Sequence, residues 1–298
     1  MAEGTGLNQF AAEMPERFYD VGIAEEHAVC FAAGMATAGA RPVCAIYSTF
    51  LQRAYDQIVH DVAIQKLPVV FVLDRAGLVG PDGPTHHGTL DLSYLSSVPG
   101  MVVAAPKDGT EMKNLLYTAL QQDQGPFAIR YPKDQSIAYD PSEQYELIPI
   151  GKWETIKKGA GVAIVATGSM VPVAEKATLL LTGEGIDAAV INARYIKPLD
   201  RKLLTELAGE YETIVTVEEG TLHGGLGSQI TQFCQSLARR PERIISLGLP
   251  DNFVTHGPRS KLLADVGLTP EAVVTAIKNS RSAELLPGQV VNRLSERP

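Results

Sequence analysis

Short apolar, β-branched segments alternate with longer helical patterns along almost the whole chain. Continuous apolar strands that are separated by helices form parallel sheets whose two faces are both covered. The alternation therefore predicts an α/β protein. The segments that we expect to be strands are 43–47, 69–73, 101–105 and 127–131, followed by 162–166, 187–191, 213–217 and 244–247.

The alternation is interrupted once, at residues 148–153, where Pro149 and Gly151 favour a boundary. We therefore expect two tandem three-layer α/β domains with mostly parallel sheets, at residues 1–147 and 148–280. Residues 281–298 are polar and contain proline, so we expect a frayed tail there. The expected helices are 25–38, 50–65, 110–121, 172–181, 201–208 and 228–238.

The composition excludes several classes of protein. The net charge of −8 argues against a nucleic-acid partner, which would need a basic face. No apolar run approaches the roughly 20 residues that span a bilayer, so no membrane partner is expected. Cys30, Cys44 and Cys234 are too few and too scattered for a disulfide framework or a zinc site. We expect a soluble protein of a reducing compartment such as the cytoplasm.

An acidic turn at residues 22–28 stands out near the start of the chain. It follows a strand-like segment at 18–21 and opens a helix rich in alanine and glycine. Glu25 falls in the first helical turn, where the helix dipole favours negative charge. From these residues alone, Glu25 is either a solvated helix-capping acid or a functional carboxylate.

Aromatic and basic residues gather where the expected strands end. Tyr47, Phe50 and Arg53 lie at the end of one strand, and Arg75 follows the next. Ligands of open α/β sheets bind at this edge, and a guanidinium there suits phosphate. The alternatives are core packing for the aromatic residues and a surface salt bridge for Arg53.

A loop rich in glycine and proline then presents Asp82, His86 and His87. Loops of this kind often carry functional groups. Adjacent histidines rarely bind one ion together, and no third ligand is suitably spaced, so we expect no metal site. A basic run, Arg130-Tyr131-Pro132-Lys133, ends the last strand of the first domain.

The second domain offers weaker signals. The segment 218–220 precedes a glycine-rich turn at 223–227 and a helix, and 255–257 reads Thr-His-Gly. Such a turn can bind anions, but it is no dinucleotide-binding fingerprint. A tight turn that leaves the helix N-terminus free explains it better, and we expect no catalytic residue in this domain.

In their order and spacing, the acidic turn and the segments 47–57, 74–77 and 83–88 resemble the cofactor-pyrimidine domain of the 1-deoxy-D-xylulose-5-phosphate synthase family. These are thiamine diphosphate enzymes of the transketolase type. The resemblance extends from Met1 to about residue 280. Enzymes of this type hold the diphosphate and Mg²⁺ through a Gly-Asp-Gly motif followed by Asn, and the chain contains no Gly-Asp-Gly. The resemblance implies the second half of an enzyme, with the Mg²⁺ ligands expected in a missing N-terminal domain.

The resemblance also implies roles for individual residues. Glu25 would hydrogen-bond the aminopyrimidine ring and activate the cofactor, and Phe50 would stack on that ring. His86 is the second expected catalytic residue. Lys133 stands where the family has an arginine that contacts the triose phosphate, which puts that single contact in doubt. The expected substrate-binding residues are Tyr47, Arg53, Arg75, Asp82, His86 and Lys133.

The implied reaction condenses pyruvate with D-glyceraldehyde 3-phosphate, with loss of CO₂, to 1-deoxy-D-xylulose 5-phosphate. The expected partners are the N-terminal domain of the same enzyme and a second copy of the chain. The small-residue helix at 25–38 resembles helices that pack near the dimer axis, although it could instead be buried inside one domain. By resemblance the protein belongs in a bacterial cytoplasm or in the plastid stroma of a plant or alga.

Two other functions remain open at this point. One is the β-subunit of a 2-oxo-acid dehydrogenase, which shares the two-domain layout and works with a separate partner chain. The other is a non-catalytic module for dimerisation or regulation. The segments 47–57 and 74–87 favour the synthase, and the presence of Glu25 argues against a non-catalytic module. We expect this chain by itself to be catalytically inactive.

Overall fold

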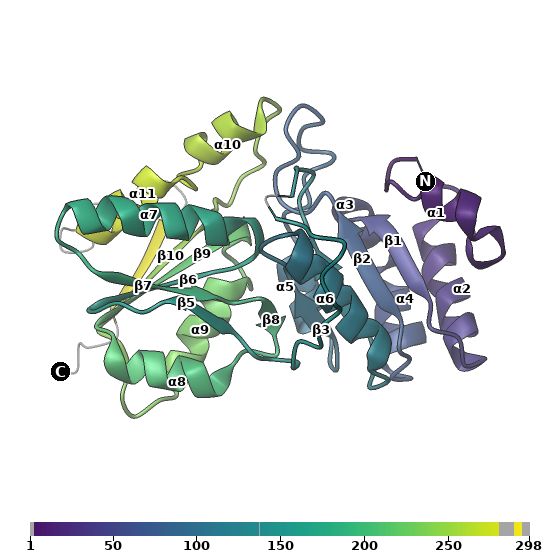
Figure 1. Cartoon of the computed structure of the whole chain (residues 1–298), viewed down its shortest axis with the longest axis horizontal. Helices are drawn as coiled ribbons and strands as arrows, with labels where there is room; N and C mark the ends of the chain where they lie inside the picture. The colour runs from purple at the N-terminus through teal and green to yellow at the C-terminus, as the bar shows by residue number, and fades with distance from the viewer. Residues whose placement is uncertain (1–2, 137, 280–288, 294–298) are drawn as a thin grey trace.

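The structure is a computed structural model that describes residues 3–136, 138–279 and 289–293. It contains two sheets, and helices cover both faces of each (Figure 1). The expected fold class, α/β with mostly parallel sheets, is confirmed. Within the described residues, no helix is both long enough and apolar enough to cross a membrane.

The first sheet has the strand order β1-β2-β4-β3-β8. Its first four strands are parallel, as expected, but β8 runs antiparallel to β3. Strand β8 comes from the second half of the chain, so the first sheet contains strands from both halves. The strands are β1 (Val43–Tyr47), β2 (Val70–Asp74), β3 (Val102–Ala104), β4 (Phe127–Arg130) and β8 (Tyr195–Lys197).

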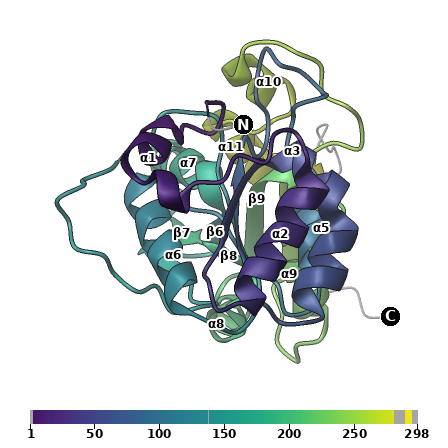
Figure 2. The same ribbon diagram turned by 90° about the vertical axis from the view of Figure 1, so that its right-hand side faces the viewer.

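Helices flank this sheet on both sides. Figure 2 places α6 on one side and both α2 and α5 on the other. A short helix, α1, precedes them near the N-terminus (Figure 1). The helices are α1 (Asn8–Glu13), α2 (Glu25–Thr37), α5 (Asp91–Ser97) and α6 (Gly109–Gln121).

Two expectations for this half were wrong. The segment 18–21 forms no strand in the described chain; Phe18 has an extended backbone but leads directly into the turn before α2. The helix expected at 50–65 is a series of short helical turns rather than one regular helix. The series consists of α3 (Ser48–Leu51), a 3₁₀ turn (Gln52–Ala54), α4 (Tyr55–Gln57) and a π-helical turn (Ile58–Ala63).

The second sheet has the order β11-β10-β9-β6-β7-β5. Its four central strands are parallel, and both edge strands are antiparallel. Strand β11 falls within the segment expected to be a frayed tail, so that expectation was wrong at 289–293; residues 281–288 and 294–298 lie outside the described residues. The strands are β5 (Glu154–Lys157), β6 (Val162–Ala166), β7 (Ala188–Asn192), β9 (Thr213–Thr221), β10 (Arg243–Leu249) and β11 (Gln289–Arg293).

Helices α7 and α11 cover one face of this sheet, and α8 and α9 cover the other (Figure 1). Helix α10 lies toward the first half of the molecule, near the loop that follows β2 (Figure 1). The helices are α7 (Val171–Gly183), α8 (Arg201–Glu210), α9 (Leu226–Gln235), α10 (Arg259–Asp265) and α11 (Pro270–Asn279).

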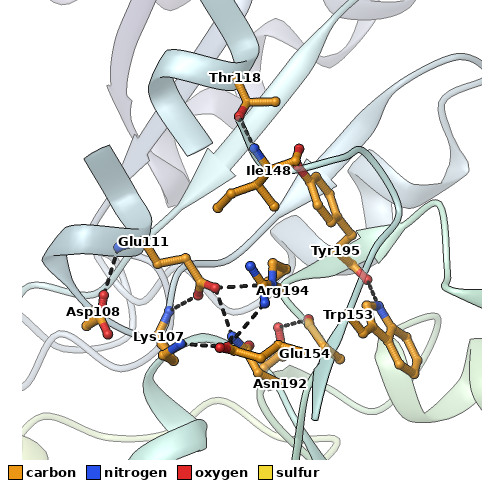
Figure 3. A network of polar contacts seen from close by, with 12 residues as sticks. Lys107, Asp108, Glu111, Thr118, Ile148, Trp153, Glu154, Asn192, Arg194 and Tyr195 are labelled. Atoms are coloured by element: carbon orange, nitrogen blue, oxygen red, sulfur yellow. Dashed lines mark hydrogen bonds and ion pairs between the residues drawn. The ribbon is translucent and has the colours of Figure 1, made fainter. Parts of the chain in front are cut away.

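The two halves share one hydrophobic core. One cluster of buried residues includes side chains from all five strands of the first sheet and from the face of the second sheet that carries Val165 and Ile191. Tyr195 is fully buried at this junction, and its hydroxyl donates to the Ile148 carbonyl at 3.0 Å. Trp153 donates from its indole N–H to the Tyr195 carbonyl at 2.7 Å (Figure 3).

A polar network crosses the same junction. Glu111 of α6 accepts a hydrogen bond from Asn192 at 2.9 Å and lies 3.2 Å from Arg194. Lys107 and Arg194 both pair with Glu154 of β5 (Figure 3). Burial raises the pKa of Glu111, while Arg194 opposes that shift. Since the network joins α6 to β5 and β7, it ties the two sheets together.

Candidate active site

The predicted site residues lie at one edge of the first sheet. Tyr47 is the last residue of β1, Arg75 follows β2, and Lys133 lies just beyond β4. These strands are parallel, so their C-terminal ends meet at the same edge. Phe50 and Arg53 belong to the helical turns directly after β1.

Aromatic rings form the centre of the site. The Tyr47 ring stacks on the Phe50 ring with centroids 5.4 Å apart, and His86 meets Phe50 edge-on at 5.3 Å. The guanidinium carbon of Arg75 lies 3.8 Å from the centroid of Tyr47, and that of Arg53 lies 4.9 Å from the centroid of Phe50. Cation–π contacts of this kind hold arginine side chains over ring faces. Five of the predicted residues therefore form one continuous cluster.

Glu25 joins this cluster through Arg53. It is the first residue of α2 and is 7% exposed, whereas its neighbour Glu26 is exposed. The Glu25 Oε1 atom accepts a hydrogen bond from Arg53 Nη1 at 3.1 Å. A buried carboxylate needs such a partner, since desolvating a charge is costly. The single guanidinium of Arg53 thus contacts both the acid and the Phe50 ring.

Arg75 is held in an unusual backbone conformation. Its φ is +61°, which lies in the left-handed region that residues other than glycine rarely adopt. Strained backbone of this kind is most common at functional sites. The Arg75 side chain pairs with Asp74 and donates to the Gly4 carbonyl at 2.9 Å, so the N-terminal segment lies against it. Burial raises the pKa of Asp74, and the charge of Arg75 opposes that rise.

The loop after β2 supplies the remaining predicted groups. Lys133 Nζ donates to Asp82 Oδ2 at 3.0 Å, and this hydrogen bond lowers the pKa of Asp82. The charges of His86 and Arg75 also lower the Asp82 pKa, so the pair lies close to the aromatic cluster. His86 is half-buried, with Nδ1 2.9 Å from Thr85 Oγ1.

His87 differs from its neighbour His86. It is buried, its Nδ1 accepts from the Val79 N–H at 3.0 Å, and its Nε2 lies 3.2 Å from the Thr255 carbonyl. Since a carbonyl only accepts, Nε2 carries the proton and the ring is the neutral tautomer. His87 therefore fastens the loop to the second half. Among the described residues, no three histidine, cysteine or acidic side chains are grouped to hold a metal ion.

Sequence reasoning missed a buried ion pair beneath the site. Arg130 Nε donates to Asp91 Oδ2 at 2.9 Å, and both side chains are almost fully buried. Ser48 also donates to Asp91, and Arg130 donates to the Glu219 carbonyl at 3.0 Å. The sequence feature that could have predicted this ion pair is an acidic residue between apolar ones, because Asp91 is flanked by two leucines.

For the glycine-rich turn of the second half, the sequence predicts the helix that follows but not the contacts at the start of that helix. It does begin a helix, α9, but the helix N-terminus is not free. The two carboxylate oxygens of Glu218 accept the N–H groups of Leu226 and Gly227, each at 2.8 Å. A Cβ at Gly225 would lie 2.2 Å from the Glu218 carboxylate, so only glycine allows this close approach. The Glu218 carboxylate therefore occupies the position at the helix N-terminus where an external anion could otherwise bind.

Known proteins match both halves of the chain. Residues 1–136 match the family described as transketolase, pyrimidine binding domain, and residues 151–273 match transketolase, C-terminal domain. A solved structure described as a split gene transketolase, inactive beta4 tetramer, is 31% identical with a TM-score of 0.83. The match covers 94% of this chain and 89% of that one. The chain belongs to the transketolase family.

Within this family of thiamine diphosphate-dependent transferases, the chain is similar to 1-deoxy-D-xylulose-5-phosphate synthases. It is 52% identical to the synthase of Pelotomaculum thermopropionicum and 51% identical to that of Aquifex aeolicus, over 93% and 94% of this chain. The matches span 43% and 44% of those relatives, so the chain covers less than half their length. The resemblance to the C-terminal portion of such synthases is confirmed.

A more distant solved structure agrees with the fold. It is a transketolase mutant from Pichia stipitis, 21% identical with a TM-score of 0.64. The match covers 80% of this chain and 33% of that one. At this identity the likeness concerns the fold alone.

Proposed function

We propose that this chain forms the pyrimidine-side wall of an active site that joins pyruvate to D-glyceraldehyde 3-phosphate. The reaction releases CO₂ and forms 1-deoxy-D-xylulose 5-phosphate. The observation that carries the proposal is the buried carboxylate of Glu25, linked by Arg53 to the Phe50 ring. The shared name of relatives about half identical to the chain supports the choice of reaction.

The residues fit the pyrimidine ring of thiamine diphosphate. A planar ring with a basic nitrogen needs a flat apolar surface and a hydrogen-bonding acid, and Phe50 and Glu25 supply these. When bound, the cofactor supplies the electron sink for decarboxylation, and the protein supplies orientation and electrostatics. Glu25 would hold at its carboxylate the proton that it shares with the ring nitrogen. Arg53 is 52% exposed at its side chain and can turn toward solvent when Glu25 changes partner.

The remaining residues suit a phosphorylated aldehyde. Arg75 and Lys133 bring positive charge to one edge of the sheet, where phosphate oxygens are readily bound. Lys133 binds as a point charge rather than as a planar fork. His86 would transfer protons to or from the substrates, and Asp82 would accept hydrogen bonds from hydroxyl groups. The ring of Tyr47 would pack against the Arg75 guanidinium and hold it in place.

The proposed enzyme needs a second component. The relatives are more than twice as long as the matched region, and the split transketolase structure is described as an inactive beta4 tetramer. We infer that a first-half domain holds the diphosphate and Mg²⁺ and that the present chain is inactive without it. The working unit would be a homodimer in the cytoplasm of a bacterium or in a plastid stroma. Residues 1–147 and 148–280 would be its pyrimidine-binding and C-terminal domains.

Product analysis tests the proposed function. The chain is mixed with the first-half domain of the Aquifex aeolicus synthase, thiamine diphosphate, Mg²⁺, pyruvate and D-glyceraldehyde 3-phosphate, and the products are identified by mass spectrometry. We expect 1-deoxy-D-xylulose 5-phosphate. Acyl transfer to an added lipoyl substrate, without that product, would identify a 2-oxo-acid dehydrogenase subunit instead. Absence of any turnover would favour a non-catalytic module.

A further inference from the structure

The loop at residues 77–88, which carries Asp82 and His86, is anchored in the second half of the molecule. Leu78 is fully buried and belongs to a core cluster whose other members, such as Met170 and Val217, all come from the second half. Val79 is 3% exposed. The loop therefore has its hydrophobic anchor outside its own domain.

Glu219 and Arg259 hold the peptide groups on both sides of Leu78. Glu219 Oε1 accepts the Leu78 N–H at 2.8 Å, and Arg259 Nε donates to the Leu78 carbonyl at 3.0 Å. The two side chains also pair with each other at 2.5 Å, and Ser169 donates to the same carboxylate at 2.6 Å. Glu219 is 1% exposed. A charge pair with a buried carboxylate and several further hydrogen bonds fixes the groups that it contacts.

Gly77 is matched to this arrangement. Its φ is +76°, and a Cβ there would lie 2.5 Å from the carboxyl carbon of Glu219. The loop therefore approaches Glu219 more closely than any other residue at position 77 allows. Gly77 and Gly88 exchange backbone hydrogen bonds at 2.7 and 2.9 Å, which closes the loop at its base. The position of Glu219 thus determines where the loop begins.

Arg259 reaches a second part of the site at the same time. Its Nη1 donates to Asp134 Oδ2 at 2.8 Å, and Asp134 is adjacent to Lys133. Lys133 in turn pairs with Asp82 of the loop at 3.0 Å. The planar guanidinium of Arg259 therefore connects three segments, and a lysine could not make the same three contacts.

We propose that Arg259 and Glu219 are positioning residues, by which the second half holds loop 77–88 and Lys133 in place for the phosphorylated substrate. This inference rests on the proposed function for the identity of the substrate. The contacts themselves do not depend on it. The second half is therefore a working part of the active site.

Hydrogen–deuterium exchange on the 298-residue chain tests the positioning directly. Arg259→Ala should speed exchange of the amides in 77–88 by about tenfold, the size expected for one lost hydrogen bond, and leave strand β6 unchanged. Lys261→Ala is the matched control, because Lys261 is an exposed cation of the same helix, paired only locally with Asp265 at 3.7 Å. Equal exchange in the loop of Arg259→Ala and the wild type would overturn the proposal. If Arg259→Ala does not fold, Arg259→Lys, which keeps the charge but not the fork, is measured in its place.

Steady-state kinetics of the chain mixed with the first-half domain tests the consequence for the substrate. Arg259→Ala should raise KM for D-glyceraldehyde 3-phosphate about tenfold and leave KM for pyruvate within about twofold, and Arg259→Lys should recover part of the loss. A fall in kcat with both KM values unchanged would contradict positioning for this substrate. If the wild-type mixture is inactive, the proposed function fails, while the exchange experiment still decides whether Arg259 holds the loop.

Discussion

The carboxylate of Glu25 lies 3.1 Å from the guanidinium of Arg53, although 28 positions separate them in the chain. Glu25 is buried at the start of α2, and Arg53 is half exposed in the helical turns after β1. An ion pair with one exposed partner contributes roughly 0–1 kcal/mol, so it separates at low cost. The pair therefore gives a buried carboxylate a hydrogen-bond partner and leaves it free to change partner.

Replacing Glu25 should abolish most of the turnover. We expect Glu25→Gln to lower kcat roughly 10²- to 10⁴-fold in the mixture with the first-half domain, because the amide cannot share the proton. Glu26→Gln is the control, since Glu26 is the exposed neighbour in the same helical turn. Release of CO₂ from pyruvate measures both, and the melting temperature checks folding. If Glu25→Gln keeps more than about a tenth of the activity, its assigned role is wrong.

Removing one partner of the buried Asp91–Arg130 pair should destabilise the protein strongly. We expect Arg130→Met to lower the free energy of unfolding by about 3–5 kcal/mol, because it leaves the Asp91 charge buried without its partner. Urea unfolding followed by the fluorescence of Trp153, the chain's single tryptophan, measures this. Lys157→Met breaks a solvent-exposed pair with Asp187 and should cost less than about 1 kcal/mol. Similar losses for both variants would refute the prediction.

Glu218 should make stability depend on pH. Burial raises its pKa from 4.5 to about 7, although the N–H groups of Gly227 and Leu226 oppose the shift. Since the folded-state pKa is the higher one, the contribution of this group is full below pH 4.5 and is lost as the pH rises through about 7. Each unit of pKa difference corresponds to about 1.4 kcal/mol.

The comparison that isolates Glu218 is with Glu218→Gln, which does not titrate. We expect the unfolding free energy of the wild type, relative to this variant, to fall between pH 4.5 and 7. Urea unfolding at a series of pH values measures the difference, in which the titration of other groups cancels. A difference that stays constant or rises over this range would show that Glu218 is not held with a raised pKa.

Lys133 should matter for the phosphorylated substrate in particular. We expect Lys133→Ala to raise KM for D-glyceraldehyde 3-phosphate about tenfold or more, the value of a charge-assisted hydrogen bond, and Lys133→Arg to retain most of the affinity. Lys157→Ala provides a control, because it removes an equally charged side chain on the second sheet. An unchanged KM in Lys133→Ala would mean that phosphate is bound elsewhere.

The parallel strands and the edge that holds the site could be predicted from the sequence. Runs such as 43–47 and 162–166 are apolar throughout. Such runs predict buried parallel strands even when the strands that pair with them are unknown. The positions of Tyr47 and Arg75 follow from the strand ends. Their stacking could not be predicted, because it depends on Arg75 adopting a left-handed backbone.

The contacts between the two halves could not be predicted, because no local sequence pattern indicates them. Strand β8 has three residues, and its partner β3 lies far away in the chain, so neither its existence nor its pairing is encoded in nearby residues. In the sequence, nothing distinguishes Leu78 from other leucines in loops, but its side chain packs in the hydrophobic core of the other half. In the sequence, the glutamates at 218 and 219 are distinguished only as neighbours of a glycine-rich turn. Long-range packing decides what each of them does.

The most direct test of the central claim is pyruvate-dependent CO₂ release by this chain with and without a first-half domain. Both samples contain thiamine diphosphate, Mg²⁺ and D-glyceraldehyde 3-phosphate, and mass spectrometry verifies the polypeptides present. We expect saturable release in the mixture and none from the chain alone. Release by the chain alone, or silence in a mixture whose first-half domain is active with its own second half, would contradict the central claim.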